Sequence, residues 1–502
     1  MRPLAGSSGL VKAELARRQR PASPCRVRAL TTTWLAVAAI GLSLTLQLSD
    51  GFYYEPALAW LGLVVVAGLL GVGGAPWPAS RRDVRSALGS DTRDEACAAL
   101  LAAGVLMSAV ALVTRPLGRY MADPRPWAHA DVLLVVALMT TAALAGASAR
   151  RRHWQAAAAG VVLLGGLWMG LWTVRAAPDP HIDVIPVHVD AFAALARGES
   201  PYGITFDDMY EGNEAFYTPD MRAGGKVLFG FPYPPLSLLM AWPGHALLGD
   251  LRYSEVLAFV LAAGLLVWMR PDGLGLLCAG VLLLAPRLPF HIEQGWTEPF
   301  PIVLLAATVA TALRRPQWAW LPLGLLMASK QHMALALLFS PWLVPSPRTT
   351  RNVLTFCGKA VAVAAIVTLP LALLDADAFY RSAILLQLRE PFRLDSLSFA
   401  RLLVAEGWAL DKQGAVVVSL SAGLIGIGLA WWRAPRTPAG FAAALGLVCL
   451  LLAAFGKKAF LNYYLLVVAA WLVALAAAGR RSPALQSTAV VGHDAPCLPE
   501  SS

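Results

Sequence analysis

Long apolar runs recur from one end of this 502-residue chain to the other, and they constrain its fold more than any other feature. A run of about 17–25 apolar residues can cross the ~30 Å hydrocarbon core of a bilayer as an α-helix. The chain is 57% hydrophobic and 14% charged, whereas soluble domains average about 45–50% apolar and about 25% charged residues. The sequence lacks the short segments of alternating hydrophobicity that a transmembrane β-barrel requires. We therefore predict an all-α, polytopic transmembrane helical bundle.

The apolar runs predict about 14 spans, and they divide the chain into four regions. The regions are a basic tail (1–28), a four-span N-terminal extension (29–154), a membrane module (155–480) and a disordered Ser/Ala/Pro-rich tail (481–502). The run 236–249 is expected to be a partial or re-entrant segment, because a full crossing would invert the sides of the later arginine-rich loops. The expected spans are 30–48, 57–75, 96–114, 130–148, 155–174, 254–269, 273–286, 299–313, 317–329, 331–345, 353–374, 413–432, 441–455 and 460–478.

The formal net charge of +10 is best explained by the cytoplasmic loops of a membrane protein. Lys and Arg are retained on the cytoplasmic side of membranes, and the tail 1–28 alone carries seven basic groups. We therefore expect a multi-pass plasma-membrane protein with both termini in the cytoplasm. We expect its surface to contact the lipid bilayer, and we expect it to bind no nucleic acid. The six cysteines are scattered without the spacing of a metal site or a disulfide framework, so we expect free thiols. We also expect no metal and no cofactor.

The longest polar interval, 175–235, falls on the outer side in this topology and contains Asp183. If residues 185–197 are helical, Asp183, Asp190 and Arg197 lie on one face, because seven residues make nearly two turns. An apolar stripe beside them is typical of an amphipathic helix on the membrane surface. On this pattern alone, carboxylates that only face water are an equally good interpretation.

Ionisable residues also interrupt the apolar segments that follow. The segment between two apolar spans contains Arg287, His291, Glu293, Gln294 and Glu298. Further along, Lys330 lies within about 28 apolar residues. A lysine at such a place is costly and points to function, and the alternative is a lysine that extends to the lipid headgroups.

Positive charge also gathers on the outer side late in the chain. The interval 375–412 contains Arg381, Arg389 and Arg393, and Lys457-Lys458 with Asn462 precedes the final span. Positive charge there runs against the positive-inside bias, so it indicates an anionic ligand. The two lysines are also compatible with an inverted final span.

The order of these motifs resembles that of the polytopic C-type (GT-C) glycosyltransferases, in particular the family 87 group of polyprenol-phosphate-mannose-dependent mannosyltransferases. The similarity covers roughly residues 155–480 and rests on order and spacing, with four additional spans before it. The motifs are Asp183, Gly198-x-x-Pro-Tyr202, Tyr233-Pro-Pro235, Glu293-Gln-Gly295, Arg314-Arg315 and Lys330.

This resemblance implies a metal-independent, inverting hexosyltransferase with its active site on the outer face. The donor would be a polyprenyl phosphate that carries a hexose, and mannose is the expected hexose. The acceptor would be a lipid-linked or cell-envelope glycan. By position Asp183 is the expected base that takes the proton of the acceptor hydroxyl, and Asp190 is its competitor.

The remaining expected roles follow from the charge of the leaving phosphate. Lys330, Arg287 and Arg381 are the expected phosphate-binding cations, and His291 would orient the base or contact the sugar. Tyr202, Tyr233, Glu293 and Gln294 are expected to line the donor and acceptor sites.

Two other classes remain open from the sequence. A membrane transporter or flippase also uses intramembrane charge and broken helices, but it predicts polar residues at mid-bilayer and symmetry between halves. A polymerase or ligase of envelope polymers would need large arginine-rich outer loops, and the interval 375–412 is compatible with that class.

Overall fold

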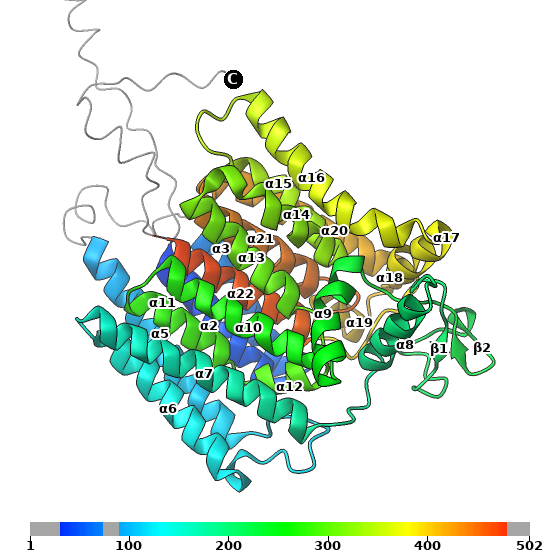
Figure 1. The fold of residues 1–502 in the computed structure, drawn as a ribbon, viewed down its shortest axis with the longest axis horizontal. Coiled ribbons are helices and arrows are strands. Elements are labelled where there is room, and N and C mark those ends of the chain that lie inside the picture. Colours follow the sequence, from blue (N-terminus) through cyan, green and yellow to red (C-terminus); the bar gives the residue numbers. More distant parts are fainter. Residues whose placement is uncertain (1–30, 74–89, 479–502) are drawn as a thin grey trace, which may run out of the picture.

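The computed structural model describes residues 31–73 and 90–478, which form a bundle of helices packed side by side (Figure 1). The two tails predicted at 1–28 and 481–502 lie outside the described residues. The strands of the described part form one small antiparallel sheet in the order β1-β3-β2, made of β1 (Phe206–Asp207), β2 (Arg222–Ala223) and β3 (Lys226–Val227). The predicted helical architecture is therefore confirmed.

Eight described helices are long and apolar enough to cross a membrane. Their outward faces carry exposed aliphatic side chains, among them Leu63, Leu164, Ile366 and Leu424. Such faces suit lipid and not water, so the chain is a multi-pass membrane protein. The eight are α2 (Thr32–Ser49), α3 (Glu55–Gly73), α5 (Ser90–Thr114), α6 (Ala130–Ser148), α7 (Arg152–Ala176), α10 (Arg252–Met269), α16 (Thr350–Ala372) and α20 (Lys412–Arg433).

Shorter apolar helices fill the interior of the bundle. They are α11 (Gly273–Leu283), α13 (Pro299–Arg314), α14 (Trp320–Ser329), α21 (Pro438–Ala454) and α22 (Leu461–Ala477). Nearly every residue of α22 is buried, because α2, α10, α11, α13 and α21 pack around it (Figure 1). A helix that is hydrophobic all round is expected at such a central position.

Side-chain caps fix where several of these helices begin. The carboxylates of Asp272 and Asp411 accept backbone N–H groups at the starts of α11 and α20. The hydroxyls of Thr349 and Thr437 do the same for α16 and α21. Each cap satisfies N–H groups that have no partner within the helix.

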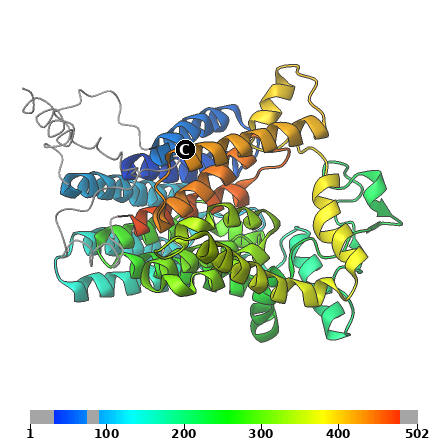
Figure 2. The same cartoon turned by 90° about the horizontal axis from the view of Figure 1, so that it is seen from above.

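The two ends of the bundle differ in structure (Figure 2). One end, called here the loop end, carries α8 (Val184–Ala196), the small sheet and the segments α17 (Ala376–Phe379), η6 (Tyr380–Leu385), α18 (Leu386–Arg389) and α19 (Phe399–Ala405). The opposite end, called the tail end, carries the short turns at 149–151, 270–272, 315–319 and 434–437. Three short 3-10 helices complete the connections: η1 (Pro126–Ala128), η2 (Pro219–Met221) and η3 (Pro316–Trp318).

Helix α9 (Pro235–Leu248) begins and finishes at the loop end. It starts after the N-cap residue Pro234, which follows Tyr233, and a left-handed Gly249 ends it. Arg252, at the start of α10, then donates to the carbonyl of Ala177 at 2.8 Å, just beyond the loop-end terminus of α7. Both ends of α9 therefore lie at the same end of the bundle, as expected for a partial segment at 236–249.

The segment expected as a span at 331–345 is broken into η4 (Gln331–Leu335), α15 (Ala336–Phe339) and η5 (Ser340–Leu343). Lys330 before it has extended backbone, and Pro341 interrupts the helical hydrogen bonding. At its other end, Arg348 donates to the carbonyls of Trp342 and Arg436, at the tail end. The segment thus connects the two ends with irregular backbone, which a membrane tolerates where protein surrounds it.

Candidate functional site

Asp183 occupies the N-cap position of α8, yet its side chain does not cap the helix. Aspartate at this position usually accepts the free N–H groups of the first turn. Here Oδ2 of Asp183 instead accepts the hydroxyl of Tyr217 at 2.5 Å, and the Asp183 N–H donates to the hydroxyl oxygen of Tyr210 at 3.3 Å. The carboxylate is therefore directed away from its own helix and toward Tyr217.

The surroundings of Asp183 favour a carboxyl group that can accept a proton. Burial raises its pKa above the ordinary value, and the charge of Glu390 adds to the rise. The hydrogen bond from Tyr217 and the charge of Lys458 act in the opposite direction. A base with a raised pKa accepts protons more strongly than an exposed aspartate.

Lys458 and Glu390 are the charged residues that act on Asp183. Their side chains pair at 2.8 Å and are 29% and 15% exposed. Burial opposes the charge of Lys458, but Glu390 outweighs it and raises the pKa of the lysine above its ordinary value. Lys458 is therefore a permanent cation at neutral pH.

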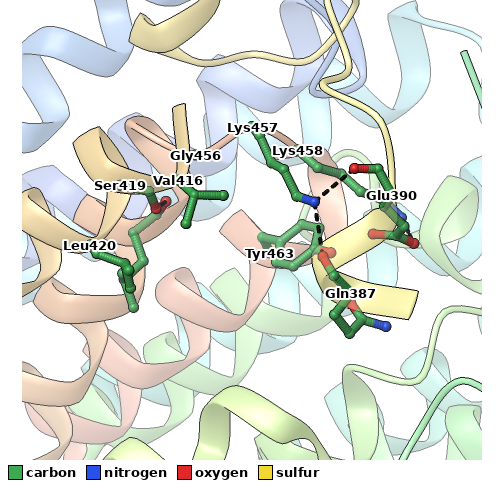
Figure 3. Close-up of a pocket in the computed structure, with 10 residues that line it drawn as sticks. Gln387, Glu390, Val416, Ser419, Leu420, Gly456, Lys457, Lys458 and Tyr463 are labelled. Atoms are coloured by element: carbon green, nitrogen blue, oxygen red, sulfur yellow. Dashed lines mark hydrogen bonds and ion pairs between the residues drawn. The ribbon is translucent and has the colours of Figure 1, made fainter. Parts of the chain in front are cut away.

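A cavity of about 180 Å³ opens beside this pair (Figure 3). Its polar side is formed by Gln387, Glu390, Lys457, Lys458 and Tyr463, and Val416 and Leu420 of α20 form its apolar side. The ammonium of Lys457 donates to the carbonyls of Gln387 at 2.9 Å and Glu390 at 2.8 Å, so it holds the C-terminal end of α18. Burial lowers the pKa of Lys457 to about 8.

A second polar group lies buried where three short helices meet. Glu298 at the start of α13 pairs with Lys330, and its Oε1 accepts the amide of Asn462 at 2.8 Å. Nε2 of His291, in α12 (Leu288–Glu293), lies 3.7 Å from Oε2 of Glu298. The Lys330 ammonium stands over the rings of Tyr233 and Tyr463, 5.2 and 5.9 Å from their centroids.

Tyr233 joins the two groups into one site. Burial raises its pKa far above the ordinary value, and Glu298 and Asp183 both add to the rise, so both carboxylates lie within electrostatic reach. Tyr463 contacts the Lys330 side through its ring and also lines the cavity beside Lys458. These contacts define one region at the loop end. Tyr233 and Tyr463 link Lys330 to the cavity beside Lys458, and Asp183 lies within electrostatic reach of Tyr233 and Lys458.

Several predicted residues support the walls of this region. The hydroxyl of Tyr202 donates to the carbonyl of Tyr233 at 3.1 Å. Its own carbonyl accepts the hydroxyl of Ser382 at 2.9 Å, which in turn accepts the N–H of Gly230. These bonds fasten the 198–202 turn to the segment that holds Tyr233.

Other predicted residues have partners that separate them from the region. Arg287 pairs with Asp50 at 2.7 Å, and Arg381 is an exposed side chain paired with Asp377. Glu293 binds backbone N–H groups of residues 119 and 120, and Gln294 donates to Glu293. Asp190 is exposed on α8, one and a half turns beyond its start. The structure thus brings His291, Lys330 and Tyr233 together beside Glu298 and places Asp183 within electrostatic reach of Tyr233. It places Arg287, Arg381 and Asp190 elsewhere.

Sequence reasoning missed Tyr217, Glu390, Tyr463 and His188. His188 is fully buried, and its ring meets that of Phe231 edge-on at 4.9 Å. Its position on the apolar face of the predicted surface helix was a usable signal, because a histidine there is unusual. Tyr217 and Glu390 lie in long polar loops, where no pattern distinguishes them from their neighbours.

The described residues contain no group of three or more His, Cys, Asp or Glu side chains arranged to hold a metal ion. Fold and composition therefore define the class as a multi-pass helical membrane protein with a buried polar site at one end. Searches found no protein-family model, curated protein or solved structure that matches the chain.

Proposed function

We propose that this protein is a membrane glycosyltransferase that moves a hexose from a polyprenyl phosphate to a lipid-linked or cell-envelope glycan. Mannose is the hexose that we propose. The observation that carries the proposal is Asp183, a half-buried carboxylate whose side chain leaves its helix uncapped, bonds to Tyr217 and lies within electrostatic reach of Lys458. The order of motifs from Asp183 to Lys330 in the sequence supports the same reaction.

In this reaction Oδ1 or Oδ2 of Asp183 takes the proton from the acceptor hydroxyl. The hydroxyl oxygen then bonds to the anomeric carbon from the face opposite the phosphate, and the bond from that carbon to the phosphate oxygen breaks. The anomeric configuration inverts, and the polyprenyl phosphate leaves with the bonding electron pair. Because the leaving group is already a weak base, nearby cations stabilise it more effectively than a proton donor does.

Lys458 and Lys330 supply those cations, and the cavity beside Lys458 supports a lipid donor. Its apolar side is made by Val416 and Leu420 of α20, and α20 exposes Val417 and Leu424 on its outer face. A phosphate at the lysine side would leave a prenyl chain beside the apolar helix. Arg287 and Arg381 drop out of this role because of where they lie. Arg287 binds Asp50 and the carbonyl of Pro116 in the N-terminal extension, and Arg381 is an exposed side chain paired with Asp377.

The proposed topology has 14 crossings, with the loop end outside the plasma membrane and both termini in the cytoplasm. It counts the eight long helices, the five short interior helices and the broken segment from Lys330 to Leu343, and it leaves out α9. The exposed arginines at the tail end, including those at 150–152 and 315, support a cytoplasmic location for that end.

The test is transfer from polyprenyl-phosphate-mannose by the purified protein in reconstituted membranes. We expect Asp183→Asn to lower the rate by about 10²–10⁴-fold, because an amide cannot accept the proton. Asp190→Asn, on the same helix but exposed, is the matched control and should retain the rate.

Two outcomes contradict the proposal at different levels. An unchanged rate for Asp183→Asn removes that residue as the base. Absence of transfer from any polyprenyl-linked sugar, together with passage of a solute or lipid across the membrane without covalent change, identifies a transporter or flippase.

A further inference from the structure

The first four spans contact the candidate site through two turns at the loop end. One turn follows α2 and contains Asp50 and Phe52, and the other, 115–121, follows α5. Phe52 packs its ring against that of Phe460 at 5.4 Å, and the N–H of Tyr53 donates to the carbonyl of Asp395 at 2.8 Å. The N-terminal extension is therefore joined to the loops that border the cavity.

Glu293 at the end of α12 binds the 115–121 turn directly. Its buried carboxylate accepts the N–H of Arg119 through both oxygens, at 2.7 and 3.0 Å, and the N–H of Tyr120 at 2.7 Å. A carboxylate that accepts several backbone N–H groups binds them more strongly than a neutral acceptor does. Glu293 thus holds the 115–121 turn by its backbone and leaves the Arg119 side chain exposed.

Gly118 allows this close approach. A Cβ at this position would overlap Oε1 of Glu293 and lie 2.8 Å from its Cδ. A side chain at 118 therefore cannot coexist with the present position of the carboxylate.

Arg287 fastens the other end of α12 to the same extension. Its guanidinium pairs with Asp50 at 2.7 Å and donates to the carbonyl of Pro116 at 2.6 Å. It also lies over the ring of Phe290, 4.7 Å from the centroid. Both ends of this six-residue helix are thus held by residues 50 and 116–120 of the extension.

We propose that the 115–121 turn of the N-terminal extension is a positioning element of the site, and that Glu293 and Arg287 are the positioning residues that bind it. Helix α12 carries His291, which lies against Glu298, and Glu298 pairs with Lys330. Fixing both ends of α12 therefore fixes the buried polar group at which the reaction is proposed to occur. The kinetic part of this inference rests on the proposed function, whereas the contact itself does not.

Hydrogen–deuterium exchange on the full-length protein tests the contact without any substrate. We expect the amides of residues 119 and 120 to be protected in the wild-type protein, and Glu293→Gln to increase their exchange at least tenfold, because a carboxamide loses one accepting oxygen. Glu199→Gln, which changes an exposed glutamate, is the control and should leave this exchange unchanged. Unchanged exchange in Glu293→Gln overturns the proposal.

A paired substitution tests the positioning role. Gly118→Ala should lower the transfer rate by up to about 100-fold, because a misplacement near 1 Å costs that much. Combining it with Glu293→Asp, which shortens the acid and removes the overlap, should recover a large part of the loss. Gly160→Ala is the control, because a Cβ there meets no atom within 4 Å.

The pH–rate profile, together with the rescue, separates positioning from general unfolding. The acidic limb of the pH–rate profile should stay in place in Gly118→Ala, because Asp183 belongs to a different element. Loss of rate without rescue by Glu293→Asp, or with a displaced limb, overturns the positioning role. If the wild-type protein transfers no sugar, the proposed function fails while the exchange result still decides the contact.

Discussion

At the scale of single residues, two aspartates seven positions apart carry different chemistry. Asp190 is exposed, whereas Asp183 is half-buried and bonded to Tyr217. Burial raises the pKa of both carboxyls, and the neighbours differ: Asp190 lies within reach of Asp207 and Lys226, and Asp183 within reach of Lys458 and Glu390. Helical periodicity places both on one face, but only Asp183 can act within the cluster.

Tyr217→Phe should move the acidic limb of the pH–rate profile to higher pH by about one unit. The hydroxyl donates to the ionised carboxylate of Asp183 and lowers its pKa, which burial raises. Removing the donor therefore raises the pKa further, and a shift of one unit corresponds to about 1.4 kcal/mol. The base is then protonated, and inactive, up to a higher pH than in the wild-type protein. The measurement is kcat/KM against pH.

Tyr202→Phe is the matched control for this shift. Its hydroxyl donates to the carbonyl of Tyr233 and not to Asp183, so the acidic limb should stay where it is. A limb that moves equally in both variants, or moves to lower pH in Tyr217→Phe, contradicts the assignment of the limb to Asp183.

At the scale of elements, the ends of short helices bring charge into the interior. Glu298 precedes α13, Lys330 follows α14, and Asn462 lies in the first turn of α22. Helices shorter than a full span end below the surface of the bundle, so their terminal residues meet inside it. The short helix α12 likewise depends on its terminal residues, because Arg287 and Glu293 bind both of its ends to the N-terminal extension.

Lys330→Met should destabilise the fold by about 3–5 kcal/mol, because it leaves the fully buried Glu298 without its cation. The double variant Lys330→Met with Glu298→Gln should recover much of this loss, since the uncompensated charge is then also removed. Thermal unfolding of the purified protein measures both effects. Lys226→Met breaks an exposed pair with Asp207, and this control should change stability by at most about 1 kcal/mol. A double variant less stable than Lys330→Met contradicts the explanation.

The sequence predicted the helices better than it predicted the residues of the site. The run 130–148 matches α6 residue for residue, because the bilayer demands a continuous apolar segment. Tyr217 reaches Asp183 across 34 residues, and Lys458 reaches Glu390 across 68. Arg287 was expected to bind phosphate, but it pairs with Asp50 in the turn after α2. Such pairings depend on how helices pack, and no local pattern encodes them.

At the scale of the whole molecule, the two ends differ in how their charges are compensated. Among the described residues, the ion pairs other than those of Arg270 with Asp94 and Asp272 all lie at the loop end. Within residues 31–73 and 90–478, the exposed arginines of the tail-end turns form no ion pair with an acidic side chain. The positive-inside bias depends on Lys and Arg in short loops close to the ends of spans, and the tail-end turns are loops of this kind. Their exposed arginines therefore support the proposed orientation.

Thiol labelling in intact cells tests that orientation. In a variant whose six cysteines are replaced by alanine, Glu199→Cys places an exposed thiol at the loop end and Arg150→Cys places one at the tail end. We expect a membrane-impermeant maleimide to label Glu199→Cys in intact cells and Arg150→Cys only after permeabilisation. The reverse pattern would put the site in the cytoplasm, where a donor displayed on the outer leaflet cannot reach Asp183. Labelling of both positions in intact cells would contradict the assignment of the two ends to opposite sides, because the 14 proposed crossings require residues 150 and 199 to be separated by the single span α7.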